Sequence, residues 1–204
     1  MPNDILSSAL GDSITKLVLV TGTAGAGKST ILGRVSQEQK DLRIINLGTE
    51  MLDILKEKFN ITDRDKIRTL DDKNTILVRN EIMNRIIASK EDAIIDTHAS
   101  VKQGRRYRPG FSIDELEKIR IGAIIYVDAT SEEILERSLS DTGRQRAYST
   151  LAEIDEWRSV NISIISTFAV YLNIPIYIIY NQHGKQDEAT AEVLRIIREI
   201  MVPK

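Results

Sequence analysis

The sequence predicts an α/β fold in which helices cover both faces of a doubly wound parallel sheet of five strands. Five short apolar runs rich in Ile and Val alternate with segments whose apolar residues recur at helical spacing. The runs are almost continuously apolar, as expected for parallel strands, because crossover helices leave neither face of the sheet to water. Four of the five runs end in polar, charged or glycine-containing sequence. Ligands bind beyond the carboxyl ends of the strands in such sheets, so we expect the functional residues at these positions.

The predicted strands span residues 16–21, 42–47, 93–96, 121–127 and 175–180. A helix after the first strand places Ile31, Leu32 and Val35 on one face. The other helical patterns are Ile76, Met83, Ile86 and Ile87; Ile134 and Leu135; Ile154, Trp157, Ile164, Ile165 and Phe168; and Leu194, Ile197, Ile200 and Met201. The spacing of Trp157, Phe168 and Tyr171 favours a core or subunit contact over a platform for base stacking.

Length and composition indicate a single domain over residues 1–204. A chain of 204 residues with 42% apolar residues is long enough to bury one sizeable core. The absence of cysteine excludes a disulfide scaffold, a thiolate-ligated metal and a cysteine nucleophile. No stretch approaches the roughly 18 consecutive apolar residues of a membrane span, and the N-terminus lacks a signal-peptide pattern, so we expect a cytoplasmic protein with no membrane partner. The net charge of −2 argues against nucleic acid as a partner.

The strongest motif is Gly22-Thr23-Ala24-Gly25-Ala26-Gly27-Lys28-Ser29, which matches GxxxxGK[ST] between a predicted strand and a predicted helix. The glycines let successive backbone N–H groups point at phosphate oxygens, and the helix N-terminus adds its positive dipole end. We expect Lys28 to reach the terminal phosphates and the Ser29 hydroxyl to ligate Mg²⁺. The motif predicts a P-loop NTPase-type fold whose nucleotide-binding residues are Gly22, Thr23, Ala24, Gly25, Ala26, Gly27, Lys28, Ser29 and Thr30.

The motif alone leaves open a kinase, a switch GTPase and a mechanical ATPase. A guanine-specific switch protein normally carries an Asn-Lys-x-Asp segment after a late strand, and Asn181-Gln182-His183-Gly184 lacks both the Lys and the Asp. The chain is also short for a motor or transporter ATPase, which needs further elements to couple hydrolysis to movement. A kinase is therefore the favoured class.

Asp96 ends the third predicted strand, so we expect its side chain at the same sheet edge as the glycine-rich loop. A carboxylate there can hold Mg²⁺ directly or through water, which makes Ser29 and Asp96 the predicted metal residues. The alternative role for Asp96 is a helix N-cap or a turn aspartate. His98, two residues further on, either donates a hydrogen bond to a substrate phosphate or caps the turn.

Cationic side chains gather in three groups, which are Arg64 and Arg68; Lys102, Arg105, Arg106 and Arg108; and Arg137, Arg144 and Arg146. Moving a phosphoryl group between two phosphorylated molecules brings many negative charges together, and guanidinium groups are well suited to hold them. Taken singly, each arginine is more often a solvated surface charge. The polar segment 141–146 differs, because it lies between two apolar helices and looks like a small flap that would exclude water from the phosphates.

Five further motifs follow the phosphate-binding motif along the chain: Asn46-Leu47-Gly48; Asp63-Arg64-Asp65; Ile95-Asp96-Thr97-His98-Ala99; Tyr107 with Pro109-Gly110; and Asp141-Thr142 with Arg144 and Arg146. Because these motifs occur in the same order as in the archaeal-type adenylate kinase family, the chain resembles that family from Lys16 to its C-terminus. The resemblance implies that ATP and AMP give two ADP with Mg²⁺ as cofactor. It also implies a five-stranded P-loop core, a helical lobe for the acceptor nucleotide at about 47–90, a short lid at about 138–150 and an N-terminal arm at 1–15. Members of this family tend to be homotrimers, so the resemblance implies a homo-oligomer.

Carried over residue by residue, the resemblance implies catalytic roles for Lys28, Arg137, Arg144 and Arg146, ATP binding by residues 22–30, and AMP binding by Gly48, Arg64, Arg68, Lys102 and Arg105. Two positions depart from the family pattern. The family's Gly-Asp after the second strand is Gly48-Thr49 here, and an arginine after the Asp-Thr-His-Ala segment is Lys102. Lysine has no bidentate fork. Either Arg105 or Arg106 takes its place, or acceptor binding is altered.

Two other functions remain open at this point. The first is a P-loop kinase for another nucleoside monophosphate or a small hydroxylated metabolite, whose acceptor hydroxyl would need a carboxylate to take its proton. The cation groups favour a phosphate acceptor instead, which is already ionised near neutral pH and needs no general base. The second is a nucleotide-dependent assembly or RNA-processing ATPase with an adenylate-kinase-like fold. The acidic pI of about 5.8 argues against it.

Overall fold

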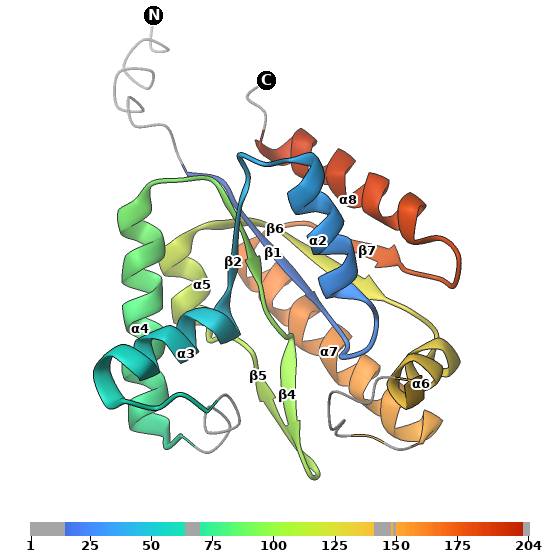
Figure 1. The fold of residues 1–204 in the computed structure, drawn as a ribbon, viewed down its shortest axis with the longest axis horizontal. Coiled ribbons are helices and arrows are strands. Elements are labelled where there is room, and N and C mark those ends of the chain that lie inside the picture. Colours follow the sequence, from blue (N-terminus) through green and yellow to red (C-terminus); the bar gives the residue numbers. More distant parts are fainter. Residues whose placement is uncertain (1–14, 64–69, 141–147, 149, 202–204) are drawn as a thin grey trace, which may run out of the picture.

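The core of the molecule is a parallel sheet of five strands in the order β2-β3-β1-β6-β7. A computed structural model describes residues 15–63, 70–140, 148 and 150–201 of the chain. Its sheet strands are β1 (Leu17–Gly22), β2 (Arg43–Asn46), β3 (Ala93–Asp96), β6 (Ile121–Asp128) and β7 (Ile176–Tyr180) (Figure 1). All five predicted strands are confirmed, and no end differs from its prediction by more than one residue.

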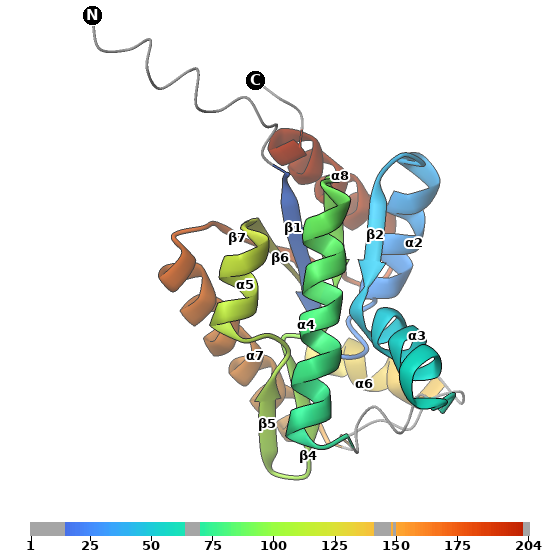
Figure 2. The ribbon, with the colours of Figure 1, turned by 90° about the vertical axis from the view of Figure 1, so that its left-hand side faces the viewer.

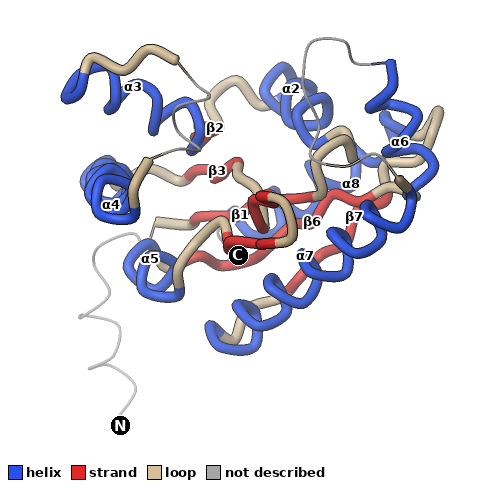
Figure 3. Tube along the Cα trace, turned by 90° about the horizontal axis from the view of Figure 1, so that it is seen from below, coloured by secondary structure: helices blue, strands red, loops and turns tan. Residues whose placement is uncertain are grey.

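Helices cover both faces of this sheet, as predicted. Helices α2 and α8 pack on one face, whereas α4, α5 and α7 pack on the other (Figure 3). Alternate residues of β1 serve the two faces, since Val18 and Val20 belong to the core under α2 and α8, and Leu17 and Leu19 to the opposite core. The helices are α2 (Lys28–Glu38), α3 (Leu47–Phe59), α4 (Asp72–Ser89), α5 (Ile113–Ile119), α6 (Ser131–Ser140), α7 (Leu151–Leu172) and α8 (Gln186–Met201). None of the described helices is both long and apolar enough to cross a membrane.

Four elements were not predicted individually from the apolar pattern, although α3 falls within the helical lobe at about 47–90 that the family resemblance implies. Strands β4 (Ser100–Gln103) and β5 (Arg106–Pro109) form a separate antiparallel hairpin that extends below the sheet (Figures 1 and 2). Helix α3 begins directly after β2, and the short α5 begins after Ser112. The signal for α5 was present, because Ser112 and Glu115 form a capping box, with each side chain bonded to the other's backbone N–H.

The predicted apolar faces of α4 and α7 are correct only in part. In α4, Met83 and Ile86 are buried, but Ile76 and Ile87 are exposed, and the inner face is completed by Val78 and Ile82. In α7, Trp157 and Phe168 are buried as predicted, whereas Tyr171 is 56% exposed. Helical spacing identifies an apolar stripe but does not say how much of it neighbouring elements cover.

The strand order brings the functional residues together. β1 lies between β3 and β6, with Val20 opposite Asp96 on one side and Gly22 opposite Val127 on the other. β3 and β6 thus lie on opposite sides of β1, so the strand order reverses there. At such a switch point a crevice opens at the carboxyl edge of the sheet, and ligands bind in it.

Arg79 of α4 fastens that helix to α5 on the face opposite α2 and α8. Its Nε and Nη2 atoms donate to the two carboxylate oxygens of Glu115 at 2.6 and 2.7 Å, and Nη2 also donates to the carbonyl of Gly110 at 2.6 Å. Burial on its own raises the pKa of Glu115, but the hydrogen bonds and charge of Arg79 outweigh it and hold that pKa below its usual value.

Glu115→Gln should lower the free energy of unfolding at pH 7 by about 2–4 kcal/mol, because it leaves a largely buried guanidinium without its ionic partner. The folded-state pKa of Glu115 lies below its unfolded value of 4.5, so this stabilisation is fully present above that pH and is lost as the pH falls through the folded pKa. Urea unfolding from neutral pH into the acid range measures it. A difference between wild type and variant that does not shrink in acid would contradict the assignment, and the exposed Glu117→Gln on the same helix is the control.

Candidate active site

The phosphate-binding loop, residues 22–30, joins the end of β1 to the start of α2. Gly25 and Gly27 both adopt left-handed backbone conformations, with φ of 95° and 90°. A Cβ atom on Gly27 would lie 2.1 Å from the Asn181 side chain, and one on Gly25 would lie 2.7 Å from the Tyr148 hydroxyl. The loop therefore needs glycine for its conformation and for its close contacts. The motif prediction of a strand, a glycine-rich turn and a helix is confirmed.

A pocket of about 650 Å³ opens beside this loop. Its walls combine the loop with α2, the end of α6, the segment after β3 and the segment after β7. The lining residues outside the loop include Arg34, His98, Arg137, Asn181, His183 and Gly184, and those from the loop are Thr23, Ala24, Gly25, Gly27, Lys28, Ser29 and Thr30. Its volume lies within the range of small-molecule sites, and its walls are rich in backbone N–H donors and cations.

Lys28 forms an ion pair with Asp96 across the β1–β3 edge. Both residues are buried, with 9% and 5% of their surface exposed. The other oxygen of Asp96 accepts a hydrogen bond from Asn46 Nδ2 at 2.5 Å, and Asn46 Oδ1 accepts from the Thr49 backbone N–H at 3.0 Å as the N-cap of α3. Asp96 thus lies at the same edge as the loop, as predicted. The chain continues from it into the hairpin and not into a helix, so it is no N-cap.

The residues present fit a magnesium ion carried by a nucleotide. Mg²⁺ keeps several waters and takes only one or two protein ligands together with phosphate oxygens. Ser29 is exposed in the pocket, and the Asp96 carboxylate lies beside the neighbouring Lys28. Within residues 15–63, 70–140, 148 and 150–201 there is no group of three or more His, Asp or Glu side chains that could hold a metal ion without the nucleotide.

Arg137 projects from the last turn of α6 onto the phosphate-binding loop. Its Nη2 donates to the carbonyl of Asn181 at 2.8 Å, its Nη1 donates to the carbonyl of Ala26 at 3.3 Å, and Glu133 lies 3.8 Å away as an ion-pair partner. The expectation that Arg137 lies near the donor phosphates agrees with this position. Its guanidinium is half-buried and already oriented by two backbone carbonyls, which reduces the entropy lost on binding an anion.

Asn181 is one of the site residues that sequence reasoning missed, and Arg34, which lines the pocket from α2, is another. Asn181 follows β7 directly, its Nδ2 donates to the carbonyl of Ala26 at 2.8 Å, and its own backbone N–H donates to the Asp128 carbonyl at 2.7 Å. It is almost fully buried under the loop. The signal was its place at the polar end of a strand, which we used only to test for guanine recognition.

The remaining predicted site residues are not at this pocket or lie outside the described part of the chain. Lys102 and Arg105 are on the β4–β5 hairpin, and neither lines the pocket. The Lys102 ammonium lies 5.6 Å from the centre of the Tyr107 ring. Gly48 is in the first turn of α3, two residues after Asn46. The four residues outside the described ranges are Arg64, Arg68, Arg144 and Arg146.

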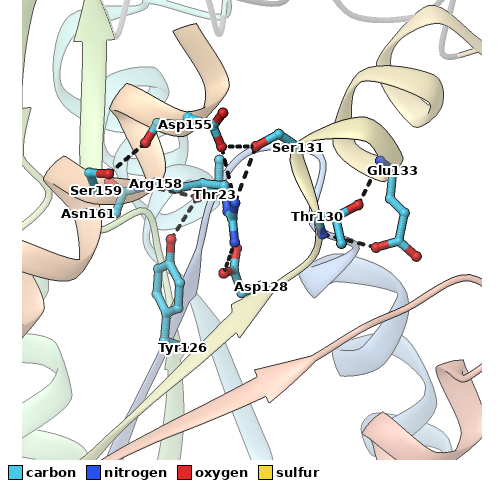
Figure 4. Close-up of polar contacts among 10 residues, drawn as sticks. All are labelled: Thr23, Tyr126, Asp128, Thr130, Ser131, Glu133, Asp155, Arg158, Ser159 and Asn161. Carbon is cyan, nitrogen blue, oxygen red and sulfur yellow. Dashed lines mark hydrogen bonds and ion pairs between the residues drawn. The ribbon is translucent and has the colours of Figure 1, made fainter. Parts of the chain in front are cut away.

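Arg158 fixes the two helices that precede and follow residues 141–147. Its Nε and Nη2 donate to the carboxylate of Asp128, at the end of β6, at 3.0 and 2.7 Å, and its Nη1 donates to Ser131 Oγ at 3.2 Å (Figure 4). The Ser131 hydroxyl donates to Asp155 at 2.5 Å. The hydrogen bond to Asp128 raises the pKa of Arg158 further, so the guanidinium stays charged. The start of α6 and the first turns of α7 are therefore held to the end of β6.

Solved structures of two shikimate kinases share this fold. The enzyme from Acinetobacter baumannii in complex with shikimate has a TM-score of 0.55 and 18% identity, covering 97% of this chain and 99% of that one. The enzyme from Bacteroides thetaiotaomicron has a TM-score of 0.51 and 18% identity, covering 89% and 98%. At this identity the similarity concerns the fold alone.

Sequence comparison is more specific. A family model described as an AAA domain matches residues 21–155, which include the phosphate-binding loop, Asp96 and Arg137. A protein from Methanococcus aeolicus named adenylate kinase is 29% identical, covering 90% of this chain and 98% of that protein. Another of that name from Thermoplasma acidophilum is 32% identical over 179 residues, covering 88% and 97%. Because a named adenylate kinase is 32% identical over 88% of this chain and 97% of its own length, this chain belongs to the adenylate kinase family.

Proposed function

We propose that this protein is an adenylate kinase, which transfers a phosphoryl group reversibly from ATP to AMP and yields two ADP. The observation that carries the proposal is the buried Lys28–Asp96 pair under a glycine-rich loop, with the Arg137 guanidinium on the same loop. Named relatives similar over nearly the full chain support the reaction. Lys28, the loop N–H groups and Arg137 would bind the donor phosphates.

The chemistry asked of the protein is positioning and charge stabilisation. An acceptor phosphate oxygen attacks the γ-phosphorus in line while the bond from that phosphorus to the β–γ bridging oxygen breaks and ADP leaves. No general base is needed because the attacking oxygen is already ionised near neutral pH. Lys28 and Arg137 stabilise the charge on the transferring group. Mg²⁺, held by Ser29 and by Asp96 directly or through water, would supply further neutralisation of the phosphate charge when it enters with ATP.

The acceptor site and the lid are part of the same proposal. Helices α3 and α4 belong to the acceptor lobe at 47–90, where Gly48, Arg64 and Arg68 would bind AMP together with Lys102 or Arg105 from the hairpin. The lid at 138–150, with Arg144 and Arg146, would exclude water during transfer, because an exposed γ-phosphate is lost to hydrolysis.

Association and location remain predictions. Val170, Tyr171, Ile178 and Tyr180 are large apolar side chains exposed on α7 and β7, and they are compatible with a contact between chains. A homo-oligomer, with the homotrimer as the form implied by the family resemblance, and a cytoplasmic location follow from the sequence only.

A coupled assay with ATP and Mg²⁺, in which AMP, CMP, UMP, GMP and no acceptor are compared, tests the function directly. We expect rapid ADP formation with AMP, because the site offers the cations Lys28 and Arg137 to a phosphate acceptor, which needs no general base. Faster transfer to another nucleotide would identify a different nucleoside monophosphate kinase. Comparable ADP formation without any acceptor would indicate an ATPase and contradict the proposal.

Lys28→Met should reduce kcat for transfer to AMP by roughly 10²–10³-fold, because a preorganised cation at the transferring group is lost. Circular dichroism establishes that the variant is folded, since Asp96 loses its ionic partner. Lys40→Met, on the exposed surface just after α2, is the control and should leave the rate unchanged. A folded Lys28→Met protein with near-normal transfer would overturn the assignment.

Asp96→Asn should raise the Mg²⁺ concentration needed for half-maximal rate by about tenfold, as expected when a residue that orients a metal or its waters loses its charge. The rate of ADP formation against free Mg²⁺ measures this, and chelation of the metal should abolish transfer. Asp92→Asn, an exposed carboxylate at the other end of β3, is the matched control. Equal Mg²⁺ dependence in both variants would remove Asp96 from the metal site.

A further inference from the structure

A chain of buried hydrogen bonds runs from the hairpin to the phosphate-binding loop. Trp157 Nε1 donates to Ser100 Oγ at 2.8 Å, and Ser100 Oγ donates to Asn161 Oδ1 at 2.6 Å. Asn161 Nδ2 donates to Thr23 Oγ1 at 3.1 Å, and Thr23 Oγ1 lies 2.7 Å from the Tyr126 hydroxyl (Figure 4). All five residues are buried, and Asn161 is 1% exposed. The chain therefore connects β4, α7, β6 and the first turn of the loop away from water.

The chemistry of the five groups fixes the direction of these bonds. An indole N–H only donates, so the Ser100 oxygen accepts from Trp157 and donates its single proton to the Asn161 side-chain carbonyl. The amide N–H of Asn161 therefore faces Thr23. Burial raises the pKa of Tyr126 to about 12, so its hydroxyl stays protonated and shares a hydrogen bond with Thr23 in either direction. Only one orientation of the Asn161 amide satisfies all partners.

A second contact holds the next residue of the loop to the same cluster. The Tyr148 hydroxyl donates to the Ala24 carbonyl at 2.9 Å. The Tyr148 ring meets Trp157 edge to face, with 5.9 Å between ring centres. Two bonds thus fix the loop from the side on which Trp157 lies. Asn161 bonds to the Thr23 side chain, and Tyr148 bonds to the Ala24 carbonyl.

An apolar side chain could fill the space that Asn161 occupies, and burying an amide costs free energy unless the amide is hydrogen-bonded. A buried amide is therefore useful where its hydrogen bonds fix the positions of neighbouring groups. Here the hydrogen bonds of Asn161 specify the place of Thr23 relative to Ser100. The loop must keep its N–H groups within tenths of an ångström of the phosphate oxygens, and small displacements of positioning groups cost large factors in rate.

We propose that Asn161 is a positioning residue for the phosphate-binding loop, which it locks to hairpin β4–β5 through Ser100 and Thr23. The proposal rests on the nucleotide-binding part of the proposed function and not on the identity of the acceptor. Asn161 touches no substrate, and it acts through the Thr23 hydroxyl. The hairpin that carries Lys102 and the loop that carries Lys28 are then parts of one rigid frame.

The test uses the full chain and two readouts, the affinity for Mg-ATP by titration calorimetry without acceptor and the steady-state constants with AMP. Asn161→Leu should weaken Mg-ATP binding by roughly tenfold, the effect of one lost buried hydrogen bond with partners left unpaired, and should raise the KM for ATP more than the KM for AMP. Ser100→Ala, which removes the hydroxyl that bonds to Asn161 and lies outside the pocket, should act alike, and Thr23→Val should also weaken binding. The double variant Thr23→Val with Asn161→Leu should be no weaker than the worse single variant, because each change removes the partner that the other leaves unpaired.

Ile165→Ala controls for loss of stability, since Ile165 is buried one turn further along α7 among apolar side chains. It should lower Tm without changing Mg-ATP affinity. Unchanged affinity in both Asn161→Leu and Thr23→Val, or an equal loss in Ile165→Ala, would overturn the positioning role. A wild-type protein that binds Mg-ATP but transfers nothing to AMP would defeat the proposed reaction and leave this test intact. If Asn161→Leu fails to fold, Ser100→Ala decides the outcome, because Ser100 contacts Asn161 and does not line the pocket.

Discussion

The ion pair between Lys28 and Asp96 is the interaction on which the site depends. A lysine buried at the bottom of a phosphate pocket is costly unless a carboxylate meets it, and removal of one partner leaves an uncompensated charge. The pair exists because β1 and β3 are neighbours with Val20 opposite Asp96, so the strand order itself is part of the charge balance. Asn46 extends the pair to the N-cap of α3, which joins the donor side to the helix that begins the proposed acceptor lobe.

Several contacts from the elements around the loop are made to its backbone carbonyls. Arg137 and Asn181 both bond to the Ala26 carbonyl, and Tyr148 bonds to that of Ala24. These bonds fix the Ala24 and Ala26 carbonyls, and the Ala26 N–H donates to the Thr23 carbonyl inside the loop at 3.0 Å. The same contacts fix glycine at 25 and 27, where a Cβ would collide with the Tyr148 hydroxyl and the Asn181 side chain.

Local sequence pattern was enough to predict the five strands, the phosphate-binding loop and the edge position of Asp96. Each of these depends on a run of apolar residues or on a motif whose members are adjacent in the chain. The hairpin was missed because its strands are four residues long and carry charged residues. Helix α5 was missed although the Ser112–Glu115 capping box can be recognised in the sequence. Asn161 could not have been found by pattern, and for Asn181 the only signal was its place at the polar end of a strand. Their roles arise from contacts with residues more than a hundred positions away, which only the packed sheet brings together.

The setting of Trp157 has an optical consequence. It is the only tryptophan in the chain, its indole N–H is bonded to Ser100, and its ring adjoins Tyr148, which is itself bonded to the loop. Indole emission depends on the polarity and hydrogen bonding of its surroundings, so a shift of the loop alters the environment of a single fluorophore. The protein therefore contains its own probe of phosphate-site conformation, excitable without a label and free of background from other tryptophans.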